Sequence, residues 1–168
     1  MTKLIIITSV LLSLIATPTK SEEKENALLI YAQSVMNMND YCDMIKALEI
    51  GKKYFKTDPD IVITVIYIES HFKVKAHNKI SNDYGLSQQN EKYYLDRYKY
   101  VKKILDREKI ACNINNKYDI YLNVLSCFYY LDFCINQKGS VTKGIKKYNG
   151  TGARAEAYLN KFLGVYYS

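Results

Sequence analysis

An uninterrupted apolar run in the middle of the chain constrains the fold more than any other feature. All eight residues from Ile61 to Ile68 are apolar or β-branched, a pattern that fits a buried strand as well as a buried helix. Asp58 and Pro59 stand just before the run. Because an aspartate N-cap followed by proline is a common start of a helix, we predict a helix that carries Glu69 near its end.

The rest of the chain is typical of helices joined by polar loops, and we expect a single all-α domain. Helical patterns cover residues 25–55, as one or two helices, then 90–110 and 118–137, and two short helices flank the turn at 148–152. Apolar residues at helical spacing support the second and third of these segments: Leu95, Tyr98, Val101 and Leu105, then Ile120, Val124, Cys127, Leu131 and Ile135. The segment HNKISNDYG, residues 77–85, predicts a polar loop.

The first 21 residues are typical of a secretion signal. Lys3 precedes an apolar run from Leu4 to Ala16, and small or polar residues follow as far as Ser21. The run is short for a membrane span, although an uncleaved anchor is an alternative. We therefore expect export to the periplasm or the cell exterior, with residues 22–168 as the mature domain.

The mature part of the chain is basic. The whole chain has a formal net charge of +7, and loss of Lys3 and Lys20 with the signal leaves 24 − 2 = 22 basic against 17 acidic residues, or +5. Such a charge suits an anionic polymer, whether cell wall, lipid headgroup or nucleic acid. Because the lysines are scattered along the sequence, the charge alone does not choose among these partners.

The four cysteines favour disulfide bonds, because an exported chain passes into an oxidising compartment. Cys127 and Cys134 lie seven residues apart on one expected helix, so their Cα atoms would be roughly 10 Å apart, beyond disulfide reach. Two pairings remain open. The first joins Cys42 to Cys127 and Cys112 to Cys134, and the second joins Cys42 to Cys134 and Cys112 to Cys127.

Glu69 stands where a helix would partly bury its carboxyl group. On a helix it shares a face with Val62, Val65, Ile66 and Phe72. Burial raises the pKa of a carboxyl group and keeps it protonated nearer neutrality, as a general acid requires. The alternative is a glutamate just past the core that faces solvent or pairs with a lysine.

Three short motifs follow one another at a characteristic spacing. They are IESHF at residues 68–72, NDYGLSQQN at 82–90 and KKYNGTG at 146–152. Together they resemble the signatures of lytic transglycosylases of the goose-type lysozyme superfamily, over roughly residues 43–165. The form DYGLxQxN, and the later CNI at 112–114, look most like the specialised members that accompany secretion, conjugation or phage DNA-entry machinery.

The resemblance implies a lysozyme-like fold and a role for each matching residue. Glu69 would be the catalytic acid and base, and Ser70 would help to shape the site. The residues expected to bind substrate are Gly85, Leu86 and Gln88 in a turn that lines the glycan cleft, Tyr148 and Asn149 in a pair whose tyrosine hydroxyl reaches toward the carboxylate, and Tyr84, whose ring could stack on a sugar.

Some positions depart from the family pattern. Ser87 stands where the family usually has Met, Val74 where it often has Pro, and Gly150 where it often has Ala. The loop between Glu69 and Gly85 is also one residue longer. These changes affect cleft shape and subsite preference, while the polar groups that the chemistry needs are kept.

The implied reaction is lytic cleavage of peptidoglycan. Its glycan strands are the expected partner, and nucleic acid is not expected to be one. Glu69 would protonate the glycosidic oxygen between N-acetylmuramic acid and N-acetylglucosamine, and the substrate's acetamido group would stabilise the positive charge at C1. The carboxylate would then take the proton of the C6 hydroxyl as this group closes on C1 to give a 1,6-anhydro product. An intramolecular nucleophile has a large effective concentration compared with water.

Two alternatives remain. A hydrolytic muramidase would need a second carboxylate about 5 to 9.5 Å from the first. Asp83, 14 residues after Glu69, is the nearest candidate, although its sequence context favours a turn-forming role. The other alternative is a weakly active peptidoglycan-binding scaffold of a secretion apparatus.

No metal or organic cofactor is expected. The sequence has no CxxC pair, and neither His71 nor His77 belongs to an HExxH motif, so the spacing typical of a zinc site is missing.

Overall fold

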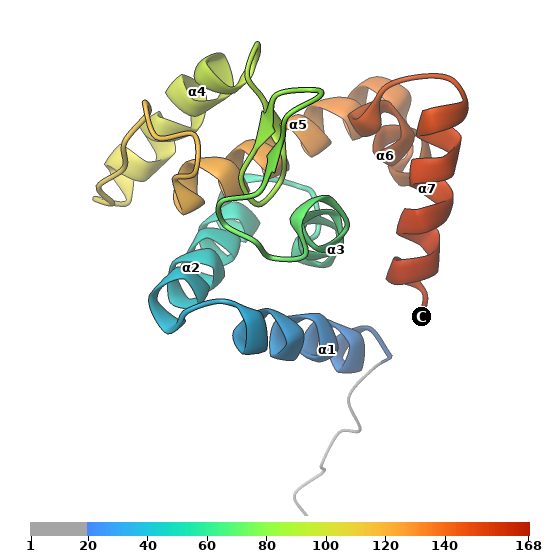
Figure 1. Ribbon diagram of the computed structural model, residues 1–168, viewed down its shortest axis with the longest axis horizontal. Coiled ribbons are helices and arrows are strands. Elements are labelled where there is room, and N and C mark those ends of the chain that lie inside the picture. Colours follow the sequence, from blue (N-terminus) through green and yellow to red (C-terminus); the bar gives the residue numbers. More distant parts are fainter. Residues whose placement is uncertain (1–19) are drawn as a thin grey trace, which may run out of the picture.

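The computed structural model describes residues 20–168, with side chains from residue 27 onward. These residues form seven α-helices and a three-stranded sheet (Figure 1). In chain order the elements are α1 (Lys20–Val35), α2 (Met38–Tyr54), α3 (Pro59–Ser70), β1 (His77–Asn78), β2 (Asp83–Tyr84), β3 (Gln89–Asn90), α4 (Tyr94–Arg107), α5 (Ile120–Lys138), α6 (Val141–Asn149) and α7 (Ala153–Tyr166). The expected helical class is confirmed.

The predicted secretion signal, residues 1–21, lies almost wholly outside the described residues. In the part of the chain that is described, none of the helices has the length and apolarity needed to cross a membrane.

Helix α3 lies at the centre of the structure, with α1, α2, α5 and α7 around it (Figure 1). Asp58 caps its first turn by accepting a hydrogen bond from the N–H of Asp60 at 2.9 Å, and Pro59 is its first residue. Every residue from Ile61 to Ile66 is buried. A helix that is covered on nearly all sides must be apolar all round, which explains why the run lacks an amphipathic period. The prediction of a helix here is confirmed.

The end of α3 differs from the expected pattern. The helix stops at Ser70, and the next two residues have left-handed backbone conformations, with φ values of 50° at His71 and 60° at Phe72. Phe72 therefore does not continue the helical face of Glu69, although its side chain is buried. Glu69 itself lies in the last turn, where the helix leaves the core.

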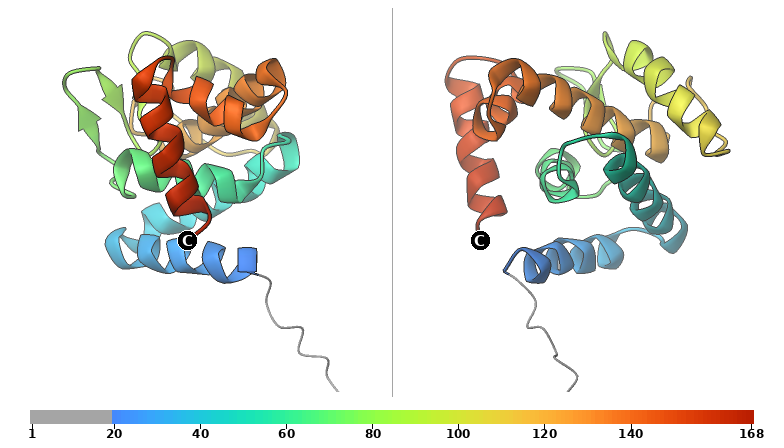
Figure 2. Two further views of the ribbon diagram at one scale, coloured as in Figure 1. Left: turned by 90° about the vertical axis from the view of Figure 1, so that its right-hand side faces the viewer. Right: turned by 180° about the vertical axis from the view of Figure 1, so that it is seen from behind.

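A small antiparallel sheet occupies part of the segment predicted as a polar loop. Its strands lie in the order β1-β2-β3, with His77 opposite Tyr84 and Asp83 opposite Asn90. Figure 2 shows the sheet projecting to one side of the helices. The loop prediction was wrong here, because strands of two residues are too short to show the alternation by which strands are predicted.

Helices α2 and α5 approach each other closely at a glycine. A Cβ atom added to Gly51 would lie 2.1 Å from the ring of Phe128 on α5. One turn further along α5, the Asp132 carboxylate accepts hydrogen bonds from the backbone N–H groups of Lys56, at 2.9 Å, and Thr57, at 2.7 Å. This helix pair therefore also holds the segment that leads into α3.

Replacement of Gly51 by alanine should destabilise the fold, by about 1 to 3 kcal/mol, because the added methyl group overpacks the contact with Phe128. Gly164, in α7, is the matched control, since an added Cβ there meets nothing within 4 Å and alanine should stabilise the helix by about 0.5 to 1 kcal/mol. Urea unfolding of both variants measures the two effects. Equal stabilities would contradict the close packing of α2 on α5.

Candidate active site

The carboxyl group of Glu69 lies where α3 meets α7. The residue is half-buried, and loss of hydration raises the pKa of its carboxyl group to about 7. The negative charge of Asp83 contributes to this rise, whereas the nearby hydroxyl of Tyr158 and the positive charge of Lys161 oppose it. The expectation that burial raises this pKa agrees with the structure.

Tyr158 and Lys161, both on α7, are neighbours of Glu69 that the sequence analysis missed. The Tyr158 hydroxyl is buried and close enough to lower the pKa of Glu69 as a donor, although the contact is not a hydrogen bond of ordinary geometry. Burial raises the pKa of Tyr158 well above its usual value, so the hydroxyl keeps its proton. Lys161 donates from Nζ to the backbone oxygen of Ile68 at 3.3 Å, which holds its charge beside the end of α3.

The resemblance predicts that the Tyr148 hydroxyl reaches toward the Glu69 carboxylate. In the structure Tyr148 lies in the same cluster, but its hydroxyl is hydrogen-bonded to the turn at 85–88. Its hydroxyl donates to the backbone oxygen of Ser87 at 3.0 Å and lies 3.7 Å from the Cys127 sulfur. Its ring stacks on that of Tyr158, with centroids 6.5 Å apart. Burial, together with the nearby charge of Glu69, raises the pKa of Tyr148 well above its usual value. Tyr148 therefore contacts both the turn at 85–88 and Tyr158, which neighbours the carboxyl group.

The turn at 85–88 is held from α5 by Asn123. The backbone of Gly85 has a φ of 79°, and a Cβ atom there would lie 2.3 Å from the Asn123 amide nitrogen, so glycine is required. The Asn123 amide accepts a hydrogen bond from the N–H of Ser87 at 2.7 Å and donates one to the backbone oxygen of Tyr84 at 3.1 Å. Asn123 was not among the residues predicted for the site, and its polar side chain in the largely apolar segment 118–137 is the sequence signal that could have indicated this contact.

The serine that departs from the family pattern has a buried hydrogen-bonding role. Ser87 is fully buried, its hydroxyl lies 2.8 Å from Oδ1 of Asn123, and it accepts a hydrogen bond from the Gln89 amide at 2.8 Å. Gln89 in turn accepts from Arg97 at 2.7 Å, and the guanidinium of Arg97 lies 3.7 Å from the ring centroid of Tyr130. Ser87, which stands where the pattern that the chain resembles usually has methionine, thus has polar partners that include Asn123 on α5.

The other residues of the turn support its shape. Leu86 is buried in the core. Gln88 has a left-handed backbone, with φ of 48°, and its amide donates to the backbone oxygens of Gly85 at 2.9 Å and Ala76 at 3.2 Å. The Gln88 side chain is thus engaged with the loop that follows α3.

Of three further residues expected in the site, two contact other groups and one is exposed. Ser70 donates to the backbone oxygen of Ile66 at 3.1 Å within α3. The ring of Tyr84 stacks on His77, with centroids 4.3 Å apart. Asn149, the last residue of α6, is exposed. Sugar contacts by Tyr84 and Asn149 stay predictions.

Asp83 is close enough to Glu69 for its charge to raise the pKa of Glu69. Its carboxylate also accepts hydrogen bonds from the Asn90 amide, at 2.7 Å, and from the hydroxyl of Ser81. These bonds fit the structural role favoured by the sequence, and the nearby charge keeps Asp83 relevant to the choice between the two enzyme reactions.

All four cysteines carry free thiols in the structure, so the two expected disulfide bonds are not formed there. Cys127 and Cys134 lie on one helix, α5, as expected. The thiol of Cys127 is buried within the cluster around Tyr148, and this burial raises its pKa to about 12, so it stays neutral. Bridges formed in an oxidising compartment stay a prediction.

The cluster suits proton transfer by a single carboxyl group. A pKa near 7 allows Glu69 to be protonated or ionised at neutral pH, and the Tyr158 hydroxyl and Lys161 ammonium both favour the ionised form.

Among residues 27–168, no group of three or more His, Cys, Asp or Glu side chains is placed to hold a metal ion.

The comparisons with known proteins assign no family to the chain. Neither the models of protein families nor the curated proteins yield a match. The function is therefore argued from the geometry of the site and the sequence motifs.

Replacement of Tyr158 by phenylalanine should raise the pKa of Glu69 above about 7, because the nearby hydroxyl, acting as a donor, stabilises the carboxylate. Carbon-13 NMR of the glutamate carboxyl groups across a pH series measures the change, with the Glu69 signal assigned from its loss in Glu69→Gln. Tyr167→Phe, at an exposed position, should leave the pKa unchanged. A lower pKa in Tyr158→Phe would exclude this hydroxyl as a donor to Glu69.

Proposed function

We propose that the protein is an exported peptidoglycan lytic transglycosylase with a lysozyme-like fold and with Glu69 as its catalytic acid and base. The observation that carries the proposal is the carboxyl group of Glu69, whose pKa is raised to about 7 next to Tyr158 and close to Tyr148. The three sequence motifs support it, since the second and third meet where Tyr148 donates to Ser87.

In the proposed reaction, Glu69 acts first as an acid and then as a base. Its proton goes to the glycosidic oxygen between N-acetylmuramic acid and N-acetylglucosamine, and the bonding electron pair leaves with that oxygen. The acetamido group of the substrate stabilises the cation at C1. The ionised carboxylate then removes the proton of the C6 hydroxyl, whose oxygen bonds to C1. The carboxyl group regains its proton, and no water is consumed.

The surroundings of Glu69 suit both halves of this cycle. Desolvation and the charge of Asp83 favour the protonated form, which the first step needs. Tyr158 and Lys161 favour the ionised form, which the first step produces. Because the opposing effects leave the pKa near neutrality, neither form is strongly disfavoured under ordinary conditions.

A hydrolytic muramidase is the second candidate, and the charge of Asp83 close to Glu69 is the observation that favours it. In that reaction Asp83 would position a water molecule to attack C1. A scaffold with little turnover is less favoured, since a binding protein gains nothing from a shielded carboxyl group that titrates near pH 7. The form of the second motif further supports a role in local opening of the wall for a secretion, conjugation or phage entry apparatus.

Replacement of Glu69 by glutamine should lower the release of soluble glycan fragments from purified cell walls at least about a hundredfold, because the titrating proton is removed while the size of the side chain is kept. In the wild type, activity should fall as the pH rises above about 7, where the protonated acid is lost. Glu49→Gln, on the exposed side of α2, is the matched control. Lysis by a folded Glu69→Gln protein at the wild-type rate would disprove the assignment.

The reaction product separates the two enzyme candidates. A transglycosylase leaves 1,6-anhydro-N-acetylmuramic acid ends, whereas a hydrolase leaves reducing ends that are heavier by one water, about 18 mass units. We expect anhydro ends from the wild type and also from Asp83→Asn, which mass spectrometry of the fragments would detect. Asp96→Asn, on the exposed side of α4, is the control. Reducing ends that disappear in Asp83→Asn alone would establish the muramidase instead.

A further inference from the structure

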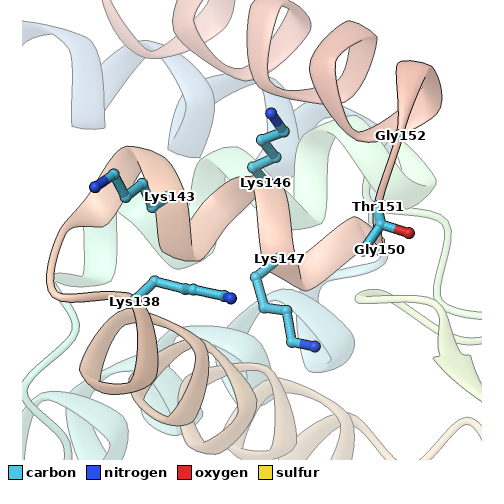
Figure 3. A pocket seen from close by; sticks show the side chains of 7 residues that line it. All are labelled: Lys138, Lys143, Lys146, Lys147, Gly150, Thr151 and Gly152. Carbon is cyan, nitrogen blue, oxygen red and sulfur yellow. The ribbon is translucent and has the colours of Figure 1, made fainter.

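A pocket lined by lysines lies between the end of α5, helix α6 and the loop before α7. Its volume is about 300 Å³, and its lining residues are Lys138, Lys143, Lys146, Lys147, Gly150, Thr151 and Gly152. Figure 3 shows that Lys138 from α5 and Lys147 from α6 both extend into the space between these helices. Neither lysine takes part in the chemistry proposed for Glu69.

Most of the positive charge around this pocket is not neutralised within the protein. Lys146 forms an ion pair with Glu156 on α7. Among residues 27–168, no carboxylate lies within ion-pair distance of Lys138, Lys143 or Lys147. Positive charges without partners on neighbouring helices create a positive potential that attracts an anionic ligand.

A series of contacts leads from the pocket to the candidate active site. Lys147 immediately precedes Tyr148 in α6, and the ring of Tyr148 lies 5.4 Å from that of Tyr130 between centroids. Tyr130 lies close enough to the thiol of Cys134 to affect the pKa of that thiol, and the charges of Lys147 and Lys138 act on the same thiol. The pocket therefore shares helix α6 with Tyr148 of the cluster around Glu69.

We propose that this lysine pocket binds the carboxylate groups of the peptide stem carried by N-acetylmuramic acid, on the same strand that Glu69 cleaves. The inference rests on the proposed function, because it identifies the anion from the polymer expected in the cleft. In peptidoglycan each stem branches from the glycan and carries several carboxylates. A strand bound at Glu69 would therefore carry these groups on a short peptide that could reach along α6, the helix shared by Tyr148 and the pocket.

The shape of the pocket favours a stem peptide over a single phosphate group. Its unpaired lysines come from two helices and their ammonium groups stand apart (Figure 3), which suits carboxylates spaced along a short peptide better than one compact anion. A volume of about 300 Å³ is also at the lower end of the range for small-molecule sites, so a few peptide residues could enter.

The double variant Lys138→Gln/Lys147→Gln tests the pocket with two substrates, intact glycan strands and strands from which an amidase has removed the stems. Each exposed ion pair is expected to change binding roughly 1.4-fold to 5-fold, so two pairs give about 2-fold to 30-fold. KM for intact strands should rise by that factor with kcat unchanged, and KM for stripped strands should stay the same. Added salt should reduce the difference between the two proteins.

Two further variants separate a specific pocket from a general effect. Lys46→Gln/Lys52→Gln removes the same charge from the exposed face of α2 and should leave both KM values unchanged. Lys138→Glu leaves Lys147, the residue before Tyr148, unchanged. It should weaken the binding of intact strands more than Lys138→Gln does, because it reverses the charge. An equal loss on intact and stripped strands, or no loss on either, would overturn the proposal.

Direct binding distinguishes failure of this inference from failure of the proposed function. NMR titration of the protein with soluble stem peptides should shift the resonances of Lys138 and Lys147. If these shifts occur but cell walls release no fragments, the pocket assignment stands and the enzyme assignment fails. If fragments are released without such shifts, the enzyme assignment stands and the pocket assignment fails. Tighter binding of a glycerol phosphate polymer than of stem peptides would overturn the carboxylate assignment.

Discussion

The rest of the structure depends on the burial of α3. Each Ile or Val side chain that α3 buries contributes about 1.5 to 3 kcal/mol, so this helix is held firmly at the centre of the fold. Glu69 directly follows the buried Ile68 in its last turn. The carboxyl group is therefore positioned by the core, at the place where the core meets the small sheet and α7. A mobile carboxyl group would be hydrated and would keep an ordinary pKa.

Helix α5 arranges the other side of the site. Its residues Asn123, Cys127, Tyr130 and Cys134 follow one another at intervals of three or four, so they lie along one face of the helix. Asn123 holds the Gly85 turn, Cys127 lies against Tyr148, and Tyr130 and Cys134 lead toward the lysine pocket. A single helical face thus connects the turn, the tyrosine cluster and the basic pocket.

The shielding that suits Glu69 for chemistry also lowers the stability of the folded protein. Below its ordinary pKa of 4.5 the group is protonated in both the folded and unfolded chains. Between 4.5 and about 7 the folded chain keeps a proton that the unfolded chain releases, so stability declines as the pH rises through this range. The loss is on the order of a few kcal/mol, which the burial of α3 can offset.

The sequence by itself determined most of the helices and placed one carboxylate at the end of an apolar run. The Asp58-Pro59 start and the apolar run predict α3, and helical spacing predicts α4 and α5, because caps and periodicity act between residues only a few positions apart. Only the tertiary structure placed Tyr158, 89 residues away, beside Glu69, and Asn123, 36 residues away, against Ser87. The two-residue strands are too short to show alternation, and the lysine pocket depends on how the end of α5 packs on α6 and the loop after it. Such contacts depend on how helices meet, and no local pattern in the chain records that arrangement.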